Sequence, residues 1–315
     1  MIHVFGPVPS RRLGLSLGID LLPAKTCSYD CLYCQVGRTT AKTIEPGDLC
    51  SLSGVFDELR ETLERVTPDV ITLSGSGEPT LHLHIDQVIQ FVKARTDRKI
   101  VVLTNGSLLW REDVRAKVSG AHLIMPTLST VVEETFQRIH RPHPDLRLPL
   151  ILQGIKELRQ TFKGELFLEV MLLAGLNDSE AEVEGLRKTI QEISPDRVQL
   201  NTVVRPPADG KALPLDRQRL EEIKSFFGDV AEIIVDTRSK KTGGKGDPSA
   251  AVIVEMAKRR PVRVQDVALA LNQPVRSAEA LIKGLLIKGA LTEQKHEGEA
   301  YFIAKTWSLG PGQRK

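Results

Sequence analysis

The sequence lacks the features that mark membrane and secreted proteins. No apolar run in its 315 residues approaches the roughly 18–20 residues that span a bilayer. The first residues, MIHVFGPVPSRRLG, lack the apolar segment and the small-residue cleavage site of a signal peptide. We therefore expect a cytoplasmic protein with no membrane partner. Disulfides are rare in that compartment, so the four cysteines point to metal binding or catalysis.

Strong charge and compositional bias are also absent. A formal net charge of +3 does not by itself indicate a nucleic-acid partner. Hydrophobic residues make up 41 % of the chain and charged residues 26 %, which is the composition of an ordered globular protein. No internal repeat of roughly 20–50 residues is visible. The length suits one large domain, or one domain with a small appendage.

The chain does show a regular alternation of two patterns. Short, nearly continuous apolar runs such as VITL and IVVL predict strands buried on both faces, at residues 15–21, 70–73, 99–103, 122–125, 166–172, 198–202 and 231–235. Apolar residues at spacings of three and four predict helices between most of these strands, at residues 55–65, 85–94, 112–118, 133–139, 149–161, 180–193 and 217–227. The alternation predicts an α/β fold, either a barrel, open or closed, or a doubly wound sheet. In a barrel, functional residues follow the C-terminal ends of the strands.

The pattern changes near residue 236. Residues 237–249, TRSKKTGGKGDPS, are basic and rich in glycine, and we interpret them as a linker or else as a surface loop. Beyond them the sequence predicts three helices and then a β-hairpin, at residues 250–258, 264–271, 277–288, 291–294 and 301–304. This order resembles a winged-helix domain at residues 250–315, in which the third helix is the recognition element. The predicted division is a core at 1–236, a linker and a small second domain.

Three of the four cysteines share one loop directly after the first predicted strand. Cys27, Cys31 and Cys34 have the spacing C-x3-C-x2-C, and cysteine thiolates are the standard ligands of iron–sulfur clusters. Three cysteines can hold three corners of a four-iron cluster and leave the fourth iron open, as catalytic metals require. The methionine end of S-adenosylmethionine (SAM) offers an amine and a carboxylate to an open iron. A structural zinc would need a fourth ligand such as Cys50, and a redox dithiol would not use Cys27.

The same loop carries an aromatic residue, Tyr33, in the pattern C-x3-C-x-aromatic-C. This pattern resembles the signature of the radical SAM superfamily, and the resemblance covers roughly residues 1–236. By this resemblance Tyr33 is a candidate for contact with the cofactors. The resemblance implies a partial (β/α)6 TIM-like barrel that binds a [4Fe–4S] cluster and SAM. It also implies an electron donor such as flavodoxin or ferredoxin, and reductive cleavage of SAM to a 5′-deoxyadenosyl radical.

A motif at the next strand end extends the resemblance. Residues 74–80, SGSGEPT, look like the Gly-Gly-Glu-Pro motif of the superfamily, with Ser76 in place of the first glycine. By resemblance, Gly77, Glu78 and Pro79 contact the methionine amine of SAM. Glycines allow close approach of the backbone, and carbonyls and carboxylates accept hydrogen bonds from an ammonium group. The alternative is a simple turn with a solvated glutamate.

Polar residues in three further strand regions are candidates for ligand contacts. Asn105, in LTNG, could bind the ribose hydroxyls of SAM, or it could be a turn or helix-capping residue. Ser129, in PTLS, is assigned a ligand contact by the resemblance. Gln199 and Asn201 alternate with apolar residues in VQLN, which indicates that they face a lumen or cleft where adenine or substrate could sit.

Two longer stretches resemble one branch of the superfamily. GPVPSRRLGLSLGIDLLPAKTCSYDC and RIHRPHPDL look like the branch related to the wyosine-type tRNA synthases, which build a ring onto a tRNA guanine. Those synthases carry cysteines for a second cluster and a Schiff-base lysine. Here only Cys50 lies outside the cysteine loop, and Lys25 is a lysine candidate by proximity alone. The resemblance therefore implies the chemistry class and an RNA substrate, but not the wyosine reaction.

Charge in the C-terminal part bears on the substrate. Residues 249–315 hold eleven Lys or Arg against six Asp or Glu, a balance that suits phosphate contacts. Winged helices also bind proteins or only cap a barrel. We therefore expect a radical SAM enzyme whose substrate the sequence does not identify, with RNA as the first candidate. Two alternatives remain: an iron–sulfur redox sensor that binds DNA through the winged helix, and a radical SAM enzyme acting on a protein or peptide. SAM binding separates the sensor from both enzymes.

Overall fold

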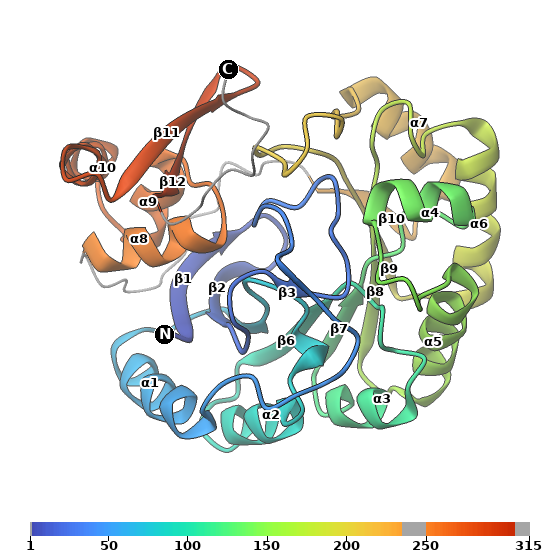
Figure 1. Cartoon of the computed structure of the whole chain (residues 1–315), viewed down its shortest axis with the longest axis horizontal. Helices are drawn as coiled ribbons and strands as arrows, with labels where there is room; N and C mark the ends of the chain where they lie inside the picture. The colour runs from blue at the N-terminus through green and yellow to red at the C-terminus, as the bar shows by residue number, and fades with distance from the viewer. Residues whose placement is uncertain (1, 235–249, 306–315) are drawn as a thin grey trace.

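The computed structural model describes residues 2–234 and 250–305 of the chain. Its main element is an eight-stranded sheet in the order β1-β2-β5-β6-β7-β8-β9-β10. The strands are β1 (Val4–Ser10), β2 (Gly14–Ile19), β5 (Val70–Leu73), β6 (Lys99–Thr104), β7 (Leu123–Pro126), β8 (Glu165–Met171), β9 (Arg197–Asn201) and β10 (Ala231–Ile233). From β2 to β10 each neighbouring pair is parallel, whereas β1 runs antiparallel to β2. The sheet curls into an incomplete barrel, with β1 and β10 at its edges (Figure 1).

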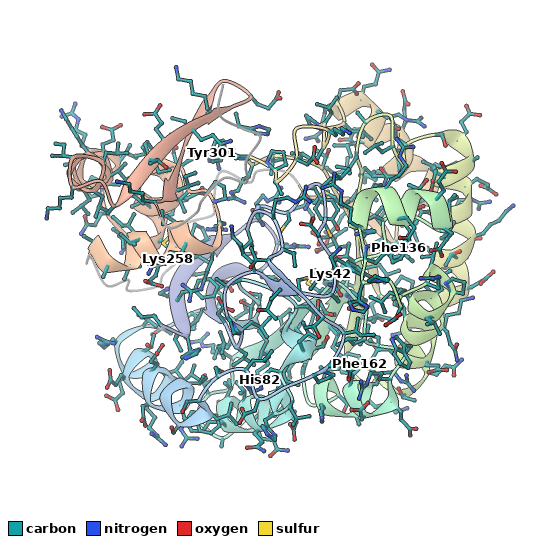
Figure 2. All side chains as sticks on the ribbon, viewed as in Figure 1. Lys42, His82, Phe136, Phe162, Lys258 and Tyr301 are labelled. Atoms are coloured by element: carbon teal, nitrogen blue, oxygen red, sulfur yellow. The ribbon has the colours of Figure 1, made fainter. Side chains whose placement is uncertain are left out.

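Helices cover the outer face of the sheet (Figure 1). They are α1 (Leu52–Arg65), α2 (Ile85–Lys93), α3 (Glu112–Val118), α4 (Glu133–His140), α5 (Leu148–Thr161), α6 (Glu180–Ile193) and α7 (Arg217–Phe227). Alternate strand residues, such as Ile71 and Leu73 of β5, point outward and join the apolar helix faces in one core. Phe136 and Phe162, labelled in Figure 2, belong to the same core. The predicted α/β fold is confirmed. Within the described ranges, no helix is both long and apolar enough to cross a membrane.

The inner face of the sheet has an apolar zone and a polar zone. Toward the N-terminal ends of the strands, a separate apolar cluster fills the floor of the barrel: Val70, Val101, Leu123, Met125 and Phe167. Beyond this floor several inward side chains are polar, among them Ser16 and Thr72, whose buried hydroxyls lie 2.9 Å apart. The upper lumen therefore offers hydrogen-bond partners to a polar ligand, whereas the floor does not.

The sequence patterns do not predict strand β1. Its segment VFGPVPS has prolines at positions 7 and 9, which suggest a loop because proline cannot donate to a sheet ladder. In the structure β1 lies at the sheet edge, where proline is tolerated, and its register shifts between Phe5 and Val8. The turn that joins β1 to β2 carries Arg11 and Arg12, and both side chains reach residues of β9.

The C-terminal part has the predicted order of elements. Three helices precede an antiparallel hairpin: α8 (Ala250–Arg259), α9 (Val264–Ala270), α10 (Val275–Ile287), β11 (Leu291–His296) and β12 (Glu299–Ala304). Their apolar core includes Phe5 and Val8 of β1, so these helices pack directly against the edge of the sheet (Figure 1). The predicted linker at 237–249 lies outside the described residues. The division into 1–236 and 250–315 therefore stays a prediction.

Candidate cluster and cofactor site

The three clustered cysteines follow β2 on one loop, which starts with the short strand β3 (Thr26–Cys27). Cys27, Cys31 and Cys34 form no disulfide, and each residue as a whole is intermediate in exposure. Burial raises the pKa of Cys27 to about 12, and the nearby Glu78 and Cys34 add to the shift. Burial and then the charges of Cys27 and Cys34 raise the pKa of Cys31. The three thiols thus lie within electrostatic reach of one another, and a metal's positive charge would stabilise their thiolates.

Hydrogen-bond donors lie beside two of these sulfur atoms. Asn105 Nδ2 is 3.5 Å from Cys27 Sγ, and His140 Nδ1 is 3.4 Å from Cys31 Sγ. Burial lowers the pKa of His140 to about 3, so the ring is neutral and can donate from Nδ1. The same Nδ1 lies 3.3 Å from the Tyr33 hydroxyl, which links the aromatic position of the motif to the second cysteine. Donors of this kind suit cluster ligands, because hydrogen bonds to cluster sulfurs stabilise their negative charge.

Cys50 lies elsewhere and contacts a histidine. Its Sγ is 3.4 Å from Nε2 of His82. Across residues 2–234 and 250–305, no group of three or more His, Cys, Asp or Glu side chains converges closely enough to hold a single metal ion. A zinc site needs such convergence, whereas cysteines that bind different irons of one cluster do not. The donor set therefore fits the predicted cluster better than zinc with Cys50 as the fourth ligand.

The cysteine loop is fixed from two sides. On one side, the N–H of Leu32 donates to the carbonyl oxygen of Ile139 in α4 at 2.9 Å. On the other side lies the SGSGEPT loop that follows β5, where the N–H of Glu78 donates to the carbonyl oxygen of Thr26 at 3.2 Å. The two motif loops therefore form one unit joined by backbone hydrogen bonds.

Gly77 is the point of closest contact between these loops. A Cβ atom at this position would lie 1.7 Å from the carbonyl oxygen of Thr26, well inside any allowed contact distance. The obstacle is backbone rather than a flexible side chain, so the loops would have to separate to admit it. Glycine is therefore required at position 77 by the contact between the loops, apart from any approach of a ligand.

Replacing Gly77 by alanine is expected to lower the rate of SAM cleavage by about 100-fold, since a displacement of about 1 Å at a reacting centre costs roughly that much. The measurement is formation of 5′-deoxyadenosine by the reconstituted protein. Gly54→Ala is the matched control, because a Cβ added at Gly54 in α1 meets nothing within 4 Å. Equal rates in the two variants would contradict this role for Gly77.

The Glu78 carboxylate is buried and already bonded within the chain. Its Oε1 accepts hydrogen bonds from the N–H and the hydroxyl of Thr80, at 3.1 and 2.6 Å, and from the hydroxyl of Thr104 at 2.6 Å. Its Oε2 accepts from the N–H of Asn105 at 2.6 Å. Burial raises the pKa of Glu78 despite these bonds. Since a carboxylate oxygen has two lone pairs, one acceptor position remains at Oε2. Glu78 therefore ties the ends of β5 and β6 together, beside η1 (Pro79–Leu81).

Asn105 forms the turn that the sequence offered as its second interpretation. Its Oδ1 accepts a hydrogen bond from the N–H of Ser107 at 2.9 Å, which closes an Asx turn. Its Nδ2 donates to Ser28 Oγ at 2.9 Å, beside the sulfur of Cys27. The structure thus places Asn105 against the cysteine loop, with each polar atom of its side chain in use.

Ser129 and Gln199 are buried and are likewise bonded within the protein. Ser129 Oγ accepts a hydrogen bond from the N–H of Met171 at 3.2 Å. Gln199 lies in the lumen as predicted, where its Oε1 accepts from Arg12 at 3.3 Å and its Nε2 donates to Glu232 at 2.8 Å. A ligand contact at either residue would have to replace or share one of these bonds.

The lumen also holds an ion-pair network that the sequence patterns do not indicate. Arg12 forms a salt bridge with Glu169 at 2.8 Å, and Asn201 Nδ2 donates to the same carboxylate at 3.0 Å. Asn201 Oδ1 accepts from Arg11 at 3.1 Å. Burial acts to raise the pKa of Glu169, but Arg12 and Asn201 hold it below its usual value. The alternation of polar and apolar residues in β9 predicted that Gln199 and Asn201 face the lumen. The arginines come from a turn, which has no such period.

The serine in place of the first motif glycine has a specific partner. Ser76 donates to the carboxylate of Asp20 from its hydroxyl at 2.6 Å and from its N–H at 3.1 Å. Asp20 is 1 % exposed, and it also pairs with Arg259 of α8 at 2.9 Å. A buried carboxylate therefore links the motif loop to the C-terminal helices.

Comparison with known proteins decides the family. The model of the radical SAM superfamily matches residues 21–185, a range that is just over half of the chain and includes both motif loops. The chain belongs to the radical SAM superfamily. Radical SAM proteins are enzymes that use a [4Fe–4S] cluster and SAM, so the predicted class and cofactors are confirmed.

Other proteins are similar in sequence to this radical SAM protein over most of its length. A UPF0026 protein of Methanocaldococcus jannaschii is 32 % identical and covers 96 % of each chain. A protein named GTPase Obg, of Brachyspira hyodysenteriae, is 36 % identical over 93 % of this chain, which spans 44 % of that relative. The solved structure of TYW1 with a lysine–pyruvate adduct superposes on this protein with a TM-score of 0.51 and 18 % sequence identity. The superposition includes 71 % of this chain and 75 % of the TYW1 chain. At that identity the likeness concerns the fold.

Proposed function

We propose that this radical SAM enzyme cleaves SAM reductively and directs the resulting radical to a substrate in the barrel lumen. The observation that carries the proposal is the unit formed by the two motif loops, with hydrogen-bond donors beside the sulfurs of Cys27 and Cys31. When bound, the cluster and SAM supply a 5′-deoxyadenosyl radical. The chain's own residues position both cofactors and line the polar lumen that receives the substrate.

The proposed roles follow from these contacts. The thiols hold three irons of the cluster: Cys27, Cys31 and Cys34. The backbone of Gly77 lies against the cysteine loop. In this proposal the backbone carbonyls of Gly77 and Pro79 accept hydrogen bonds from the methionine amine, together with the remaining lone pair of Glu78 Oε2.

Four further residues act as positioning residues in this proposal. Tyr33 and Asn105 support the cysteine loop, through His140 and through the sulfur of Cys27. Ser129 fixes the end of β8, and Gln199 orients the arginine side chain beside it in the lumen. Their predicted contacts with SAM remain part of the proposal.

An anaerobic assay tests the proposed activity. The protein is reconstituted with iron and sulfide, supplied with SAM and dithionite, and assayed for 5′-deoxyadenosine and methionine. Formation of both products in equal amounts is the expected result. A protein that assembles a cluster but binds no SAM would contradict the proposal and favour the iron–sulfur sensor.

Substrate, electron donor and compartment belong to the same proposal. RNA is the proposed substrate, because the excess of basic residues at 249–315 suits contacts with its phosphate groups. Flavodoxin or ferredoxin is the proposed donor, and the cytoplasm is the proposed compartment, because four free cysteines suit a reducing environment. Bulk tRNA should accelerate 5′-deoxyadenosine formation. Acceleration by a peptide mixture and not by tRNA would favour the protein-directed alternative.

A further inference from the structure

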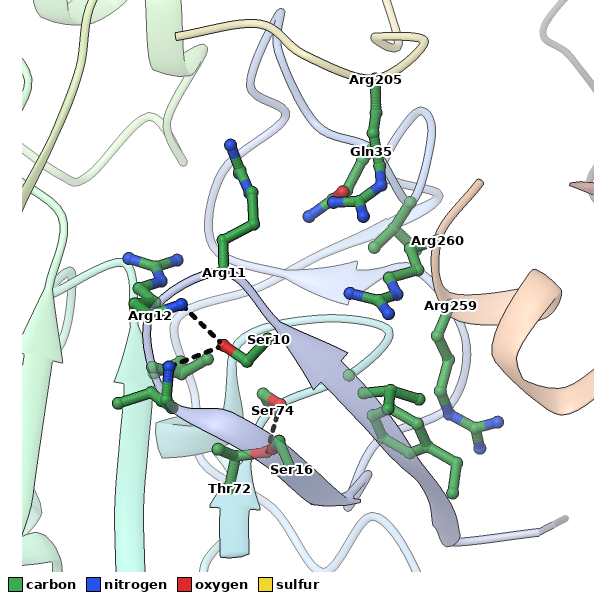
Figure 3. Close-up of a pocket in the computed structure, with 16 residues that line it drawn as sticks. Ser10, Arg11, Arg12, Ser16, Gln35, Thr72, Ser74, Arg205, Arg259 and Arg260 are labelled. Carbon is green, nitrogen blue, oxygen red and sulfur yellow. Dashed lines mark hydrogen bonds between the residues drawn. The ribbon is translucent and has the colours of Figure 1, made fainter. Parts of the chain in front are cut away.

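A cavity of about 180 Å³ opens between the barrel lumen and the C-terminal helices (Figure 3). Five arginines line it, and no described aspartate or glutamate does: Arg11, Arg12, Arg205, Arg259 and Arg260. They come from three distant segments, namely the β1–β2 turn, the chain after β9, and the end of α8. Like charges at this density cost free energy unless anions compensate them, so the partners of each arginine decide what the cavity can hold.

Two of the five arginines are compensated within the protein. Arg12 pairs with Glu169 at 2.8 Å. Arg259 pairs with Asp20 at 2.9 Å and with Glu255 at 2.8 Å. Figure 3 shows the Arg12 and Arg259 side chains turned away from the other labelled arginines. These two guanidinium groups therefore need no further anion.

Arg205 and Arg260 are compensated less completely. Arg205 is 7 % exposed at its side chain and contacts one carboxylate, Asp266, at a long 3.4 Å. Arg260 forms no salt bridge with any described residue, and its Nη2 donates to the carbonyl oxygen of Pro9 at 3.1 Å. The Nε atoms of both arginines are buried without a hydrogen-bond partner. Both arginines line the cavity, and the positive charge of each is only partly compensated by the described residues.

The repulsion between these groups appears in the acidity of Arg260. Burial above all, and then the positive charge of Arg205, lower the pKa of Arg260 to about 9, and the negative charge of Asp266 offsets only part of this shift. A buried donor without an acceptor adds its own desolvation cost. An anion between Arg205 and Arg260 would compensate the positive charges of both guanidinium groups.

We propose that this cavity binds the phosphate group of a phosphate ester between Arg205 and Arg260. Guanidinium groups present paired N–H donors that match the oxygens of phosphate. The cavity, about 180 Å³, exceeds the roughly 10–15 Å³ needed by one water more than tenfold, so an organic group fits beside the phosphate. The inference rests on the proposed function and names the substrate class of that site.

The cavity also adjoins the cofactor loops. Gln35 and Val36, which follow Cys34, line it together with Gly75 of the motif loop. Figure 3 shows Gln35 beside the guanidinium groups at the upper end of the cavity. From the motif loop a row of hydroxyls, joined by hydrogen bonds of 3.3 and 2.9 Å, follows the inner face of the sheet: Ser74, Thr72 and Ser16. A phosphate held at the arginines therefore places its organic group between the cysteine loop and the lumen.

The first test measures phosphate recognition by the full, anaerobically reconstituted chain. Uridine 5′-monophosphate and uridine are titrated by calorimetry, since an adenosine probe could enter the SAM site. The monophosphate is expected to bind at least about 10-fold more tightly than uridine, and inorganic phosphate should compete with it. The monophosphate should also raise Tm, because a ligand that binds only the folded state stabilises it.

The second test removes one donor. Arg260→Gln should weaken monophosphate binding about 10- to 100-fold, the range of a lost charged hydrogen bond, and abolish the shift in Tm. Arg276→Gln makes the same change in charge at an exposed arginine of α10 and should bind like the wild type. Arg260→Lys keeps the charge without the planar fork and should fall between them.

Equal affinity for uridine and its monophosphate in the wild type, or equal losses in Arg260→Gln and Arg276→Gln, would overturn the phosphate site. The same preparations are assayed for 5′-deoxyadenosine. If the protein cleaves SAM but does not bind the monophosphate, the phosphate site is rejected and the proposed function is kept. If it binds the monophosphate but does not cleave SAM, the proposed function is rejected and the phosphate site is kept. An oligouridylate identifies the source of the phosphate: tighter binding than the monophosphate supports an RNA backbone, and equal or weaker binding supports a free nucleotide.

Discussion

Replacing Cys31 by alanine is expected to abolish cluster assembly and, with it, SAM cleavage. Cys31 is the middle thiol of three, and His140 Nδ1 lies 3.4 Å from its sulfur. Without it, two thiols remain on a loop whose burial already disfavours thiolates, so the cluster loses a ligand that no neighbour replaces. Iron and sulfide content and the brown colour should fall to background. Formation of 5′-deoxyadenosine should fall to that of a protein-free control.

Cys50→Ala is the matched control for this prediction. Cys50 contacts His82 rather than the cysteine loop, so its loss should leave the iron content and SAM cleavage unchanged. Full SAM cleavage by the Cys31→Ala protein would contradict the role of Cys31 as a cluster ligand. Equal losses of iron in the two variants would show that Cys50 is itself a ligand.

The second large effect is expected at the buried pair between Asp20 and Arg259. Arg259→Leu leaves Asp20 without its cation at a site 1 % exposed, and the loss of one partner of a buried pair costs about 3–5 kcal/mol. The free energy of unfolding, from urea titration, should fall by that amount. SAM cleavage should fall as well, because Asp20 holds Ser76 of the motif loop.

An exposed arginine serves as the control for this experiment, because it separates the effect of losing a positive charge from the effect of leaving a buried partner unpaired. Arg217 pairs with Glu221 on the surface of α7 at 2.6 Å, and Arg217→Leu should change the free energy of unfolding little, as exposed pairs contribute little. Combining Arg259→Leu with Asp20→Asn should restore part of the lost stability, since the orphaned charge is then removed. A loss in Arg259→Leu no larger than that in Arg217→Leu would contradict the importance of the buried pair.

The elements that the sequence predicts well are those with a repeating local pattern. The predicted strand at 70–73 and the predicted helices at 112–118, 180–193 and 217–227 have the bounds observed in the structure. Strands buried on both faces show continuous apolar runs, and helices on one face of a sheet show a 3.6-residue period. The cysteine loop is as local as these elements, so its three thiols could be proposed as cluster ligands without knowledge of the fold.

Other parts of the site depend on contacts between distant segments. Strand β1 is stable because of its pairing with β2 and its burial under α8 and α9, neither of which its two prolines indicate. The guanidinium groups of Arg205 and Arg260 converge only once the C-terminal helices pack on the barrel. The bonds that occupy Glu78 come from Thr80, Thr104 and Asn105, whose hydrogen-bonding partners no local pattern reveals.

The pair between Asp20 and Arg259 has a consequence for the order in which the protein is made. Its two residues are 239 positions apart. At a synthesis rate of about 5–20 residues per second, Arg259 leaves the ribosome roughly 12–48 s after Asp20. The cysteine loop and the motif loop are both made before α8, so the carboxylate that anchors Ser76 receives its cation only after both loops have been synthesised. The enzyme therefore completes the support of its motif loop only after helix α8 has been synthesised.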